Sequence, residues 1–467
     1  MARSLTRDLT EGKPLRLILS FAAPLLFGVL FQQFYSFVDT AIVGRYLGAE
    51  KLAAVGATGS VNFLVIGLCL GFCSGFAIPI AQAFGAKNEH EVRRSAWHAA
   101  VLCAVLGLVC GLAATLLCKP LLRLMNTPEE ILDSSASYIR IIFAAIPCCV
   151  LYNMAGGILR SLGDSRTPVL FLILASLINI VLDLFLIIYC GMDVAGAAVA
   201  TAISQLVSGL GCLAVMIRKF PILKMSKEDR RFSMRMAPAM LGPGLPMGLQ
   251  FSITAIGCVM VQWSVNGLGV NAVAAVSAAS KLSMFFACVF DALASTMATF
   301  AGQNMGARKP DRVRQGLRAA SAAGIVYCVA ALGIILLFGD KMLGLFIDGG
   351  ENATVTELAF RYLKINAAFY IPLLFVNILR LCIQGMGYTR VAMFAGLSEM
   401  LARTIAALLV VPAAGFTGAC FASPAAWVMA DLFLFPCYFR LMQSLHGRLL
   451  PGTEEWKENE KQNRKAA

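Results

Sequence analysis

Two aspartates lie within long apolar stretches of the chain, where a charged side chain requires a partner or a function. Asp39 is near the end of the stretch 14–40, and Asp183 is near the end of the stretch 167–190. A carboxylate at the centre of a bilayer costs about 2.5–3.5 kcal/mol on insertion scales. Two carboxylates that meet in a low dielectric raise each other's proton affinity, so such a pair can bind and release a proton.

Neutral polar residues accompany both aspartates. Asn179 precedes Asp183 by one helical turn on the same face, and Thr201 lies at a similar depth in the next apolar stretch. Amide and hydroxyl groups can hydrogen-bond a carboxyl group in either protonation state, or donate oxygens to a sodium ion. We therefore predict a cation-coupling site, for protons or alternatively for sodium, that consists of Asp39, Asp183, Asn179, Thr201 and Tyr35. A sodium ion would be bound by the first four of these residues.

A second group of side chains is predicted to line a substrate cavity. The first apolar stretch places polar residues at helical spacing on one face, which suits a cavity wall. Scattered Met residues suit a cavity that binds flat hydrophobic cations. The candidate wall residues are Gln32, Ser36, Tyr138, Asn153, Gln250 and Met284. The alternative for these residues and for both aspartates is packing between helices, although Ser, Thr and Asn usually fill that role.

Helices must hold these residues at membrane depth. Hydrophobic residues make up 59% of the chain and charged residues 14%, and the mean hydropathy is +0.76, which excludes an ordinary soluble domain. About 20 apolar residues span a bilayer, and the unbroken apolar runs exclude a β-barrel, whose strands alternate. We predict an all-α membrane protein with twelve transmembrane helices at 14–40, 53–83, 95–118, 135–159, 167–190, 194–217, 241–265, 272–301, 316–339, 358–384, 390–412 and 416–440.

The second half of the chain repeats the first. The run Leu47–Val55 returns as Leu268–Val276, 221 residues later, and at the same offset Gln82-x-x-Gly85-Ala86-Lys87 returns as Gln303-x-x-Gly306-Ala307-Arg308. A duplicated six-helix unit predicts two pseudo-symmetric bundles that face each other across a central path, as in transporters. The predicted parts are an N-terminal bundle at 1–217, a basic linker at 218–240, a C-terminal bundle at 241–440 and a disordered tail at 441–467.

The net charge of +13 follows from where the basic residues lie. Lys and Arg gather in alternate loops, above all in the linker and after the eighth apolar stretch, and few lie in the other loops. This asymmetry predicts that both termini are cytosolic, so the charge gives no reason to expect nucleic acid as a partner. The fifteen cysteines show no metal-ligand spacing, and we predict neither a structural metal nor a cofactor.

Four short motifs follow one another along the chain: FYSFVDTAIVG from Phe34, QAFGAK from Gln82, LRSLGD from Leu159 and GAAVAT from Gly196. In order and spacing they resemble the multidrug and toxic compound extrusion (MATE) family of transporters, over roughly residues 14–440. The resemblance implies a V-shaped molecule that works as a monomer in the plasma (inner) membrane. It also implies export of organic cations by alternating access, in exchange for protons or sodium ions. Functional roles are implied for Asp39, Tyr35, Asn179, Asp183 and Thr201, and less directly for Tyr138 and Asn153.

The second bundle departs from the family's sodium-coupled branch, which has acids on the seventh and tenth helices. The predicted seventh helix has none, which favours coupling through the first bundle. Glu399 and Arg403, spaced i, i+4, are predicted to neutralise each other, and Asp431 is a candidate partner for Arg380.

The alternative function is a flippase for lipid-linked saccharides, from the same wider superfamily, which requires cationic residues in its cavity. Lys281 and Arg403 keep this alternative open. An enzyme is not expected, since no His pair, Ser–Lys dyad or catalytic loop motif stands out. A nucleotide-driven pump is excluded because no Gly-rich phosphate loop ending in Gly-Lys-Ser/Thr occurs.

Overall fold

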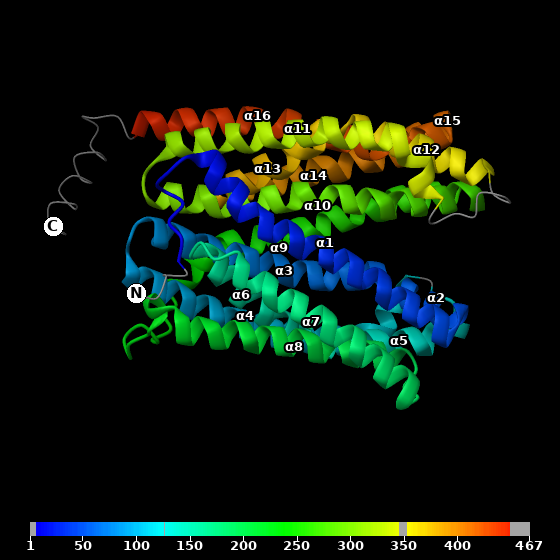
Figure 1. The fold of residues 1–467 in the computed structure, drawn as a ribbon, viewed down its shortest axis with the longest axis horizontal. Helices are drawn as coiled ribbons and strands as arrows, with labels where there is room; N and C mark the ends of the chain where they lie inside the picture. The colour runs from blue at the N-terminus through cyan, green and yellow to red at the C-terminus, as the bar shows by residue number, and fades with distance from the viewer. Residues whose placement is uncertain (1–5, 126, 345–352, 449–467) are drawn as a thin grey trace.

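The computed structural model describes residues 6–125, 127–344 and 353–448, and all regular secondary structure in these ranges is helical (Figure 1). The first half forms α1 (Pro14–Leu47), α2 (Ala49–Ala57), α3 (Gly59–Gly85), α4 (Glu89–Leu124), α5 (Glu129–Ala144), α6 (Ile146–Ser161), α7 (Arg166–Leu184) with a π-helical segment at Phe185–Tyr189, and α8 (Val194–Lys219). After a 3-10 turn at Pro221–Leu223, the second half forms α9 (Ala237–Asn266), α10 (Val270–Gly306), α11 (Pro310–Leu343), α12 (Ala353–Ala368), α13 (Tyr370–Gly385), α14 (Thr389–Ile405) with a π-helical segment at Ala406–Val410, α15 (Val411–Ala414) and α16 (Phe416–Arg448).

The predicted membrane-spanning helices are present, with two of them bent. Ten helical stretches of the described chain are long and apolar enough to cross a membrane, or twelve if each bent pair is one span. The predicted fourth helix is bent by 44° where α5 meets α6. The predicted tenth helix is bent by 52° where α12 meets α13. Pro147 and Pro372 account for both bends. Each lies in the first three residues after the break, where its ring displaces the preceding turn and it has no N–H to donate.

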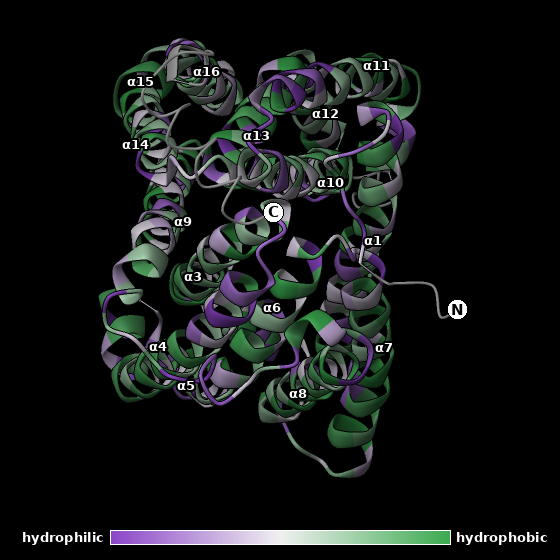
Figure 2. Cartoon of the chain, turned by 90° about the vertical axis from the view of Figure 1, so that its left-hand side faces the viewer, coloured by the Kyte–Doolittle hydropathy of each residue, from purple (hydrophilic) through white to green (hydrophobic). Residues whose placement is uncertain are grey.

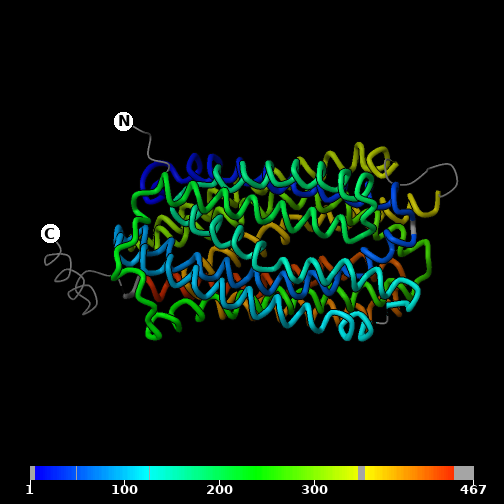
Figure 3. The backbone as a smooth tube through the Cα atoms, turned by 90° about the horizontal axis from the view of Figure 1, so that it is seen from below, coloured from blue at the N-terminus to red at the C-terminus, as the bar shows by residue number. Residues whose placement is uncertain are grey.

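The helices lie side by side, and α1 begins at the same end of the bundle at which α16 ends (Figures 1 and 3). We call this end, which also carries the linker, the terminal face. Helix α16 continues to Arg448, so residues 441–448 are helical and the predicted disordered tail does not begin at 441. Residues 449–467 of that predicted tail lie outside the described residues.

Helices α1 and α9 each cross between the two halves. Seen from the terminal face, they lie on opposite edges, between one group of helices from each half (Figure 2). The start of α1 contributes Leu17, Ile18 and Phe21 to the apolar core of the second half, while Gly28 packs against Val169 of α7. The start of α9 likewise places Met240 in the core of the first half, and its end packs against α14. The two halves are therefore interlocked by their first helices.

Contact between the halves depends on glycine. Helices α3 and α9 meet through Gly71 against Gly248 and through Gly75 against Gly244. A Cβ on Gly75 would lie 2.5 Å from the Cα of Gly244, so a larger residue would force the helices apart. Small residues four positions apart let helix backbones approach closely, and here they bring the two halves into direct backbone contact.

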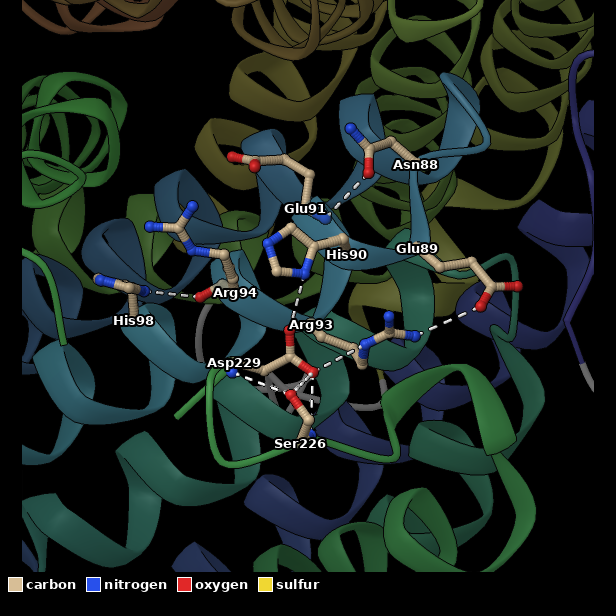
Figure 4. A network of polar contacts seen from close by, with 9 residues as sticks. All are labelled: Asn88, Glu89, His90, Glu91, Arg93, Arg94, His98, Ser226 and Asp229. Atoms are coloured by element: carbon tan, nitrogen blue, oxygen red, sulfur yellow. Dashed lines mark hydrogen bonds and ion pairs between the residues drawn. The ribbon is translucent and has the colours of Figure 1, made fainter. Parts of the chain in front are cut away.

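The linker between the halves is folded onto the start of α4 (Figure 4). The buried carboxylate of Asp229 accepts hydrogen bonds from the backbone N–H (2.9 Å) and the hydroxyl (3.0 Å) of Ser226. It also accepts one from Nε of Arg93 (3.0 Å), and its second oxygen lies 2.9 Å from Nδ1 of His90. His98 accepts a further hydrogen bond from a backbone N–H of the linker (2.9 Å). The sequence predicts only a basic segment here, whereas the structure shows a linker attached by an acid.

The substitution Asp229→Asn tests how strongly this contact stabilises the linker. Hydrogen bonds from Ser226, together with Arg93 and His90, hold the pKa of Asp229 below its ordinary value, although burial raises it. A lowered native pKa means that the ionised group stabilises the fold above about pH 4, and that this contribution is lost as pH falls through the native pKa. We expect Asp229→Asn to lower the free energy of unfolding by about 1–3 kcal/mol at pH 7, and by much less at about pH 3.

Thermal unfolding of the purified protein in detergent measures this difference. The matched control is Glu228→Gln, which removes the same charge from an exposed neighbour and should leave the midpoint unchanged at both pH values. Equal midpoints for wild type and Asp229→Asn at pH 7 would show that the linker contact contributes no stability.

Candidate functional site

A cavity of about 810 Å³ lies between the two halves. The structure places most of the predicted wall residues on its surface, namely Gln32, Ser36, Tyr138, Asn153 and Gln250, together with Tyr35, Asp39 and Thr201 from the predicted coupling site. Met284 does not line this cavity. The wall segment of α10 runs from Asp291 to Thr299, and Met284 precedes it by two helical turns, about 10 Å. It is 53% exposed, on the part of α10 that lies outside the cavity.

The two predicted carboxyl groups meet. The side chains of Asp39, on α1, and Asp183, on α7, lie within reach of one another. Asp39 lines the cavity, whereas Asp183 is completely buried and lies behind it. Because a carboxylate can only accept hydrogen bonds, one member of a hydrogen-bonded carboxyl pair must carry a proton. A carboxyl pair in this arrangement can hold one proton at the cavity wall.

Asn179 and Thr201 lie beside this pair. With its nitrogen directed toward Asp183, the Asn179 amide donates to Oδ2 of that carboxyl group (3.3 Å) and accepts from the backbone N–H of Thr201 (3.2 Å). A small polar pocket lined by Tyr35, Asn179 and Thr201 adjoins the cavity, and Tyr35 and Thr201 line both spaces. The predicted coupling residues thus form one continuous cluster between α1, α7 and α8.

A change in helix type accompanies the buried aspartate. Helix α7 becomes π-helical from Phe185, two residues after Asp183. The second half has its π-helical segment at Ala406–Val410, 221 residues later, which is the offset of the sequence repeat. Single π-helical turns often occur at functional sites, because the extra residue changes which side chains point toward the neighbouring helix.

The second half contributes a polar wall that the sequence did not reveal. Asp291, Ser295 and Thr299 share one face of α10 at four-residue spacing, and Asn377, Arg380 and Gln384 share one face of α13. Gln384 donates to Oε1 of Gln250 across the helices (2.5 Å). A period of 3.6 residues places these side chains on common faces, and that spacing is the signal by which the wall could have been found.

Arg380 has a different partner from the one predicted. It forms an ion pair with Glu399 instead of Asp431. Glu399 also lies 3.5 Å from Nη2 of Arg403, which confirms the predicted i, i+4 contact. One buried carboxylate therefore serves two guanidinium groups. Among the described residues, no group of three or more His, Cys, Asp or Glu side chains is placed to bind a metal ion.

The two halves meet at the terminal face through the repeated Gln-x-x-Gly motif. Nε2 of Gln82 donates to the carbonyl of Gly385 (3.1 Å), and Nε2 of Gln303 donates to the carbonyl of Ser161 (2.8 Å). Ser161 and Gly385 are themselves repeat equivalents, so the two bonds form a symmetric pair. Gly85 and Gly306 permit the contact. A Cβ on Gly85 would overlap the carbonyl oxygen of Gln303, and one on Gly306 would overlap that of Gln82.

The segment before α1 adds to this seam. The backbone N–H of Leu9 donates to Oε1 of Gln303 (2.8 Å), and the Leu9 carbonyl accepts from Asn304 (3.3 Å). The backbone N–H of Arg7 donates to the carbonyl of Leu162 (3.1 Å). The terminal face is thereby joined across both halves by buried hydrogen bonds, with the cavity behind it.

Comparison with known proteins identifies the family. The family model MatE matches residues 24–185 and 246–409, one range in each half. The chain belongs to the MatE family. This MatE protein is therefore a multi-pass membrane transporter of the efflux type and not an enzyme, as the sequence predicted.

Individual relatives agree with the family model. The protein is 30% identical to the probable multidrug resistance protein YoeA of Bacillus subtilis (strain 168), over 76% of this chain and 78% of the relative. It is 25% identical to the FAD transporter of Shewanella oneidensis, over 77% of this chain and 79% of the relative. A crystal structure of MATE in complex with MaL6 is 23% identical and superposes with a TM-score of 0.89, covering 96% of this chain and 100% of that one. That structural likeness confirms the fold.

We expect Asp39→Asn and Asp183→Asn each to abolish export by this MatE protein without preventing its folding. Asparagine keeps the size and hydrogen-bonding capacity of aspartate but cannot exchange a proton. The measurement is dye efflux by reconstituted protein, with size-exclusion elution as the folding check. Asp133→Asn is the matched control, because it makes the same change at an exposed carboxylate that pairs with Lys119. Wild-type efflux rates in either test variant would refute the assignment of this pair.

A second prediction concerns the seam at the terminal face. Gly85→Ala or Gly306→Ala places a methyl group against a carbonyl oxygen, and overpacking of this kind costs about 1–3 kcal/mol. That cost raises the equilibrium ratio of open to closed terminal face by about 5–150-fold. Hydrogen exchange at residues 7–10 should accelerate accordingly. Gly56→Ala is the control, since no atom lies within 4 Å of its added methyl group. Unchanged exchange in both test variants would show that the glycines do not hold the seam closed.

Proposed function

We propose that this protein exports organic cations in exchange for protons, by opening the central cavity alternately to the two sides of the membrane. The observation that carries the proposal is the close approach of Asp39 and Asp183 at the cavity wall. A carboxyl pair that holds one proton carries a charge of −1. A second proton or a monovalent organic cation can each neutralise that charge, and the two therefore exclude one another.

The same cluster supports protons over sodium as the coupling ion. A shared proton satisfies the two carboxyl groups without any further ligand. A sodium ion would have to replace that proton and be held by oxygens of Asp39, Asp183, Asn179 and Thr201. With the Asn179 amide assigned so that its N–H faces Asp183, that side offers the carboxyl group a donor in place of an oxygen ligand for sodium.

The seam at the terminal face supports alternating access. Because Gln82 and Gln303 bond to main-chain carbonyls of the opposite half, the cavity can open on this side only if both bonds break. Each repeat contributes one such glutamine bond, and the two equivalent bonds can break together. The pseudo-symmetric halves would then move as units around the cavity.

The distribution of charge supports a cytosolic terminal face. The linker and the loop between α10 and α11, both at this face, are rich in Lys and Arg, and positively charged loops remain cytosolic. We therefore place the protein in the plasma membrane with both termini inside. Since one chain supplies both walls of the cavity, a monomer suffices for transport.

The names of relatives support drugs as substrates, since YoeA is described as a probable multidrug resistance protein. Lys281 and Arg403, which kept the flippase alternative open, do not line the cavity, although two other arginines, Arg160 and Arg380, do. The cavity wall also carries Phe63 and Phe251, which offer flat apolar surface to an aromatic cation.

Ethidium transport in proteoliposomes tests the proposal, with proton and sodium gradients imposed separately. We expect a proton gradient alone to drive ethidium in the opposite direction, and a sodium gradient at constant pH to drive none. Transport that strictly requires sodium would reassign the Asp39–Asp183 site as a sodium site. No transport under either gradient, by protein with a normal unfolding transition, would contradict the proposed function.

A further inference from the structure

Residues 224–235 of the linker present an exposed, positively charged surface at the terminal face. Its five basic residues are all exposed, namely Lys224, Lys227, Arg230, Arg231 and Arg235. In the described part of the chain, none of these five side chains forms an ion pair. The structure describes the whole of this segment, and Glu228 is its one exposed acid. The positive charge of the linker surface is therefore not compensated by the protein itself.

The second acid of the segment is directed away from this surface. Asp229 is buried, and its carboxylate contacts Ser226 beside it and both Arg93 and His90 of α4 (Figure 4). It therefore compensates charge on α4 and not the charge of the linker. The same contact holds the segment against α4, so the basic side chains of the linker are directed to the outside of the protein.

Two large apolar side chains lie exposed among the basic residues. Met234 is 80% exposed and Phe232 is 41% exposed. The Phe232 ring stacks on the ring of His98 with 4.9 Å between the centroids, and the backbone N–H of Ser233 donates to Nε2 of the same histidine (2.9 Å). Helix α4 thus supports this stretch from one side and leaves Met234 uncovered. Apolar side chains next to Lys and Arg are typical of surfaces that lie in the headgroup region of a membrane.

The linker begins and ends where the lipid-facing surface of the helices ends. On α8, Ile217 is 64% exposed, and the basic residues Arg218 and Lys219 follow it directly. On α9, the exposed residues Leu241 and Leu245 lie four residues apart, starting one turn after the helix begins. These three apolar residues do not line the cavity, so they face the lipid. The linker joins the two helices at this boundary, which is the level of the phospholipid headgroups.

We propose that residues 224–235 form a docking surface for anionic phospholipids of the leaflet at the terminal face. The Lys and Arg side chains bind the phosphate groups, and Met234 contacts the acyl chains beside them. Clusters of about four to eight basic residues next to a transmembrane helix are typical of such surfaces. A dissolved polyanion would compensate the charges but leave Met234 in water, which favours the membrane as the partner. The inference is independent of the exported substrate and of the coupling ion.

Hydrogen exchange of the full chain in lipid nanodiscs tests this proposal. The nanodiscs contain phosphatidylcholine alone or with increasing fractions of phosphatidylglycerol, and the readout is the ratio of exchange rates at 224–235 without and with the anionic lipid. We expect this ratio to rise with the fraction of phosphatidylglycerol and to fall as salt is added, because salt screens the charges. Exchange at 190–193, which carry no basic residue and lie at the opposite end of the bundle, should not change.

Removal of charge from the linker should abolish this protection. The variant changes Lys227, Arg230 and Arg231 together to Gln. Each Lys or Arg beside an anionic surface contributes about fivefold to binding, so three such factors multiply to on the order of a hundredfold. We therefore expect no protection in this variant at the lipid composition that fully protects wild type.

The matched control changes Arg308, Arg314 and Arg318 together to Gln. It removes the same number of exposed charges from the terminal face, around the start of α11, and should keep the protection of the linker. Met234→Ser leaves every charge in place and should raise the fraction of phosphatidylglycerol needed for half-maximal protection. Unchanged thermal unfolding of each variant in phosphatidylcholine excludes a general loss of structure.

Equal exchange of wild type with and without phosphatidylglycerol would overturn the inference, as would full protection in the triple linker variant. Equal loss of protection in the control variant would also overturn it, because binding would then follow net charge alone. Glycerol phosphate, added at the concentration of the lipid headgroups, distinguishes a membrane from a dissolved anion. We expect it to give no protection. Protection equal to that by the lipid, or an unaltered lipid response in Met234→Ser, would contradict docking to the membrane.

Discussion

A carboxyl group buried in a membrane can accept a hydrogen bond from another carboxyl group only if one of the two is protonated, and this constraint governs the site. Asp39 and Asp183 lie close enough to satisfy each other in this way, at the boundary between the cavity and the interior of the first half. The pair needs neighbours that tolerate a change of charge, which Asn179 and Thr201 supply. It also needs a cavity that a cation can enter. Both requirements are met where α1, α7 and α8 converge, so the chemistry and the architecture depend on the same contact.

The second constraint is close approach between backbones. Gly71 and Gly75 let α3 contact α9, and Gly85 and Gly306 let the repeated Gln-x-x-Gly motifs contact each other at the terminal face. The side-chain bonds of Gln82 and Gln303 to carbonyls of the opposite half form only when the seam is closed. The proposed alternating access requires these two symmetric bonds to break. The crossing helices α1 and α9 keep the halves connected when the seam opens.

Much of this could be predicted from the sequence, because apolar length, internal repetition and helical spacing are local properties. They gave the helical membrane fold, the duplication, and a coupling cluster that the structure assembles from α1, α7 and α8. The sequence could not predict which residues of separate helices lie at the same depth, or which faces of those helices meet. Met284 has the right chemistry but lies two turns outside the cavity. Arg380 has two acids within reach on neighbouring helices, and sequence alone did not show that Glu399 is its partner. The linker contact at Asp229 likewise appears only once the helices are packed.

The measurement that tests the account most directly is the pH dependence of equilibrium binding of a permanently charged cation, tetraphenylphosphonium, to the purified protein. If a second proton and the cation compete for the single negative charge of the Asp39–Asp183 pair, the dissociation constant should rise on acidification by up to about tenfold per pH unit. It should level off at high pH, where the competing proton is absent. A dissociation constant that is the same from about pH 5 to pH 8 would contradict the central claim, because binding would then involve no exchange for a proton.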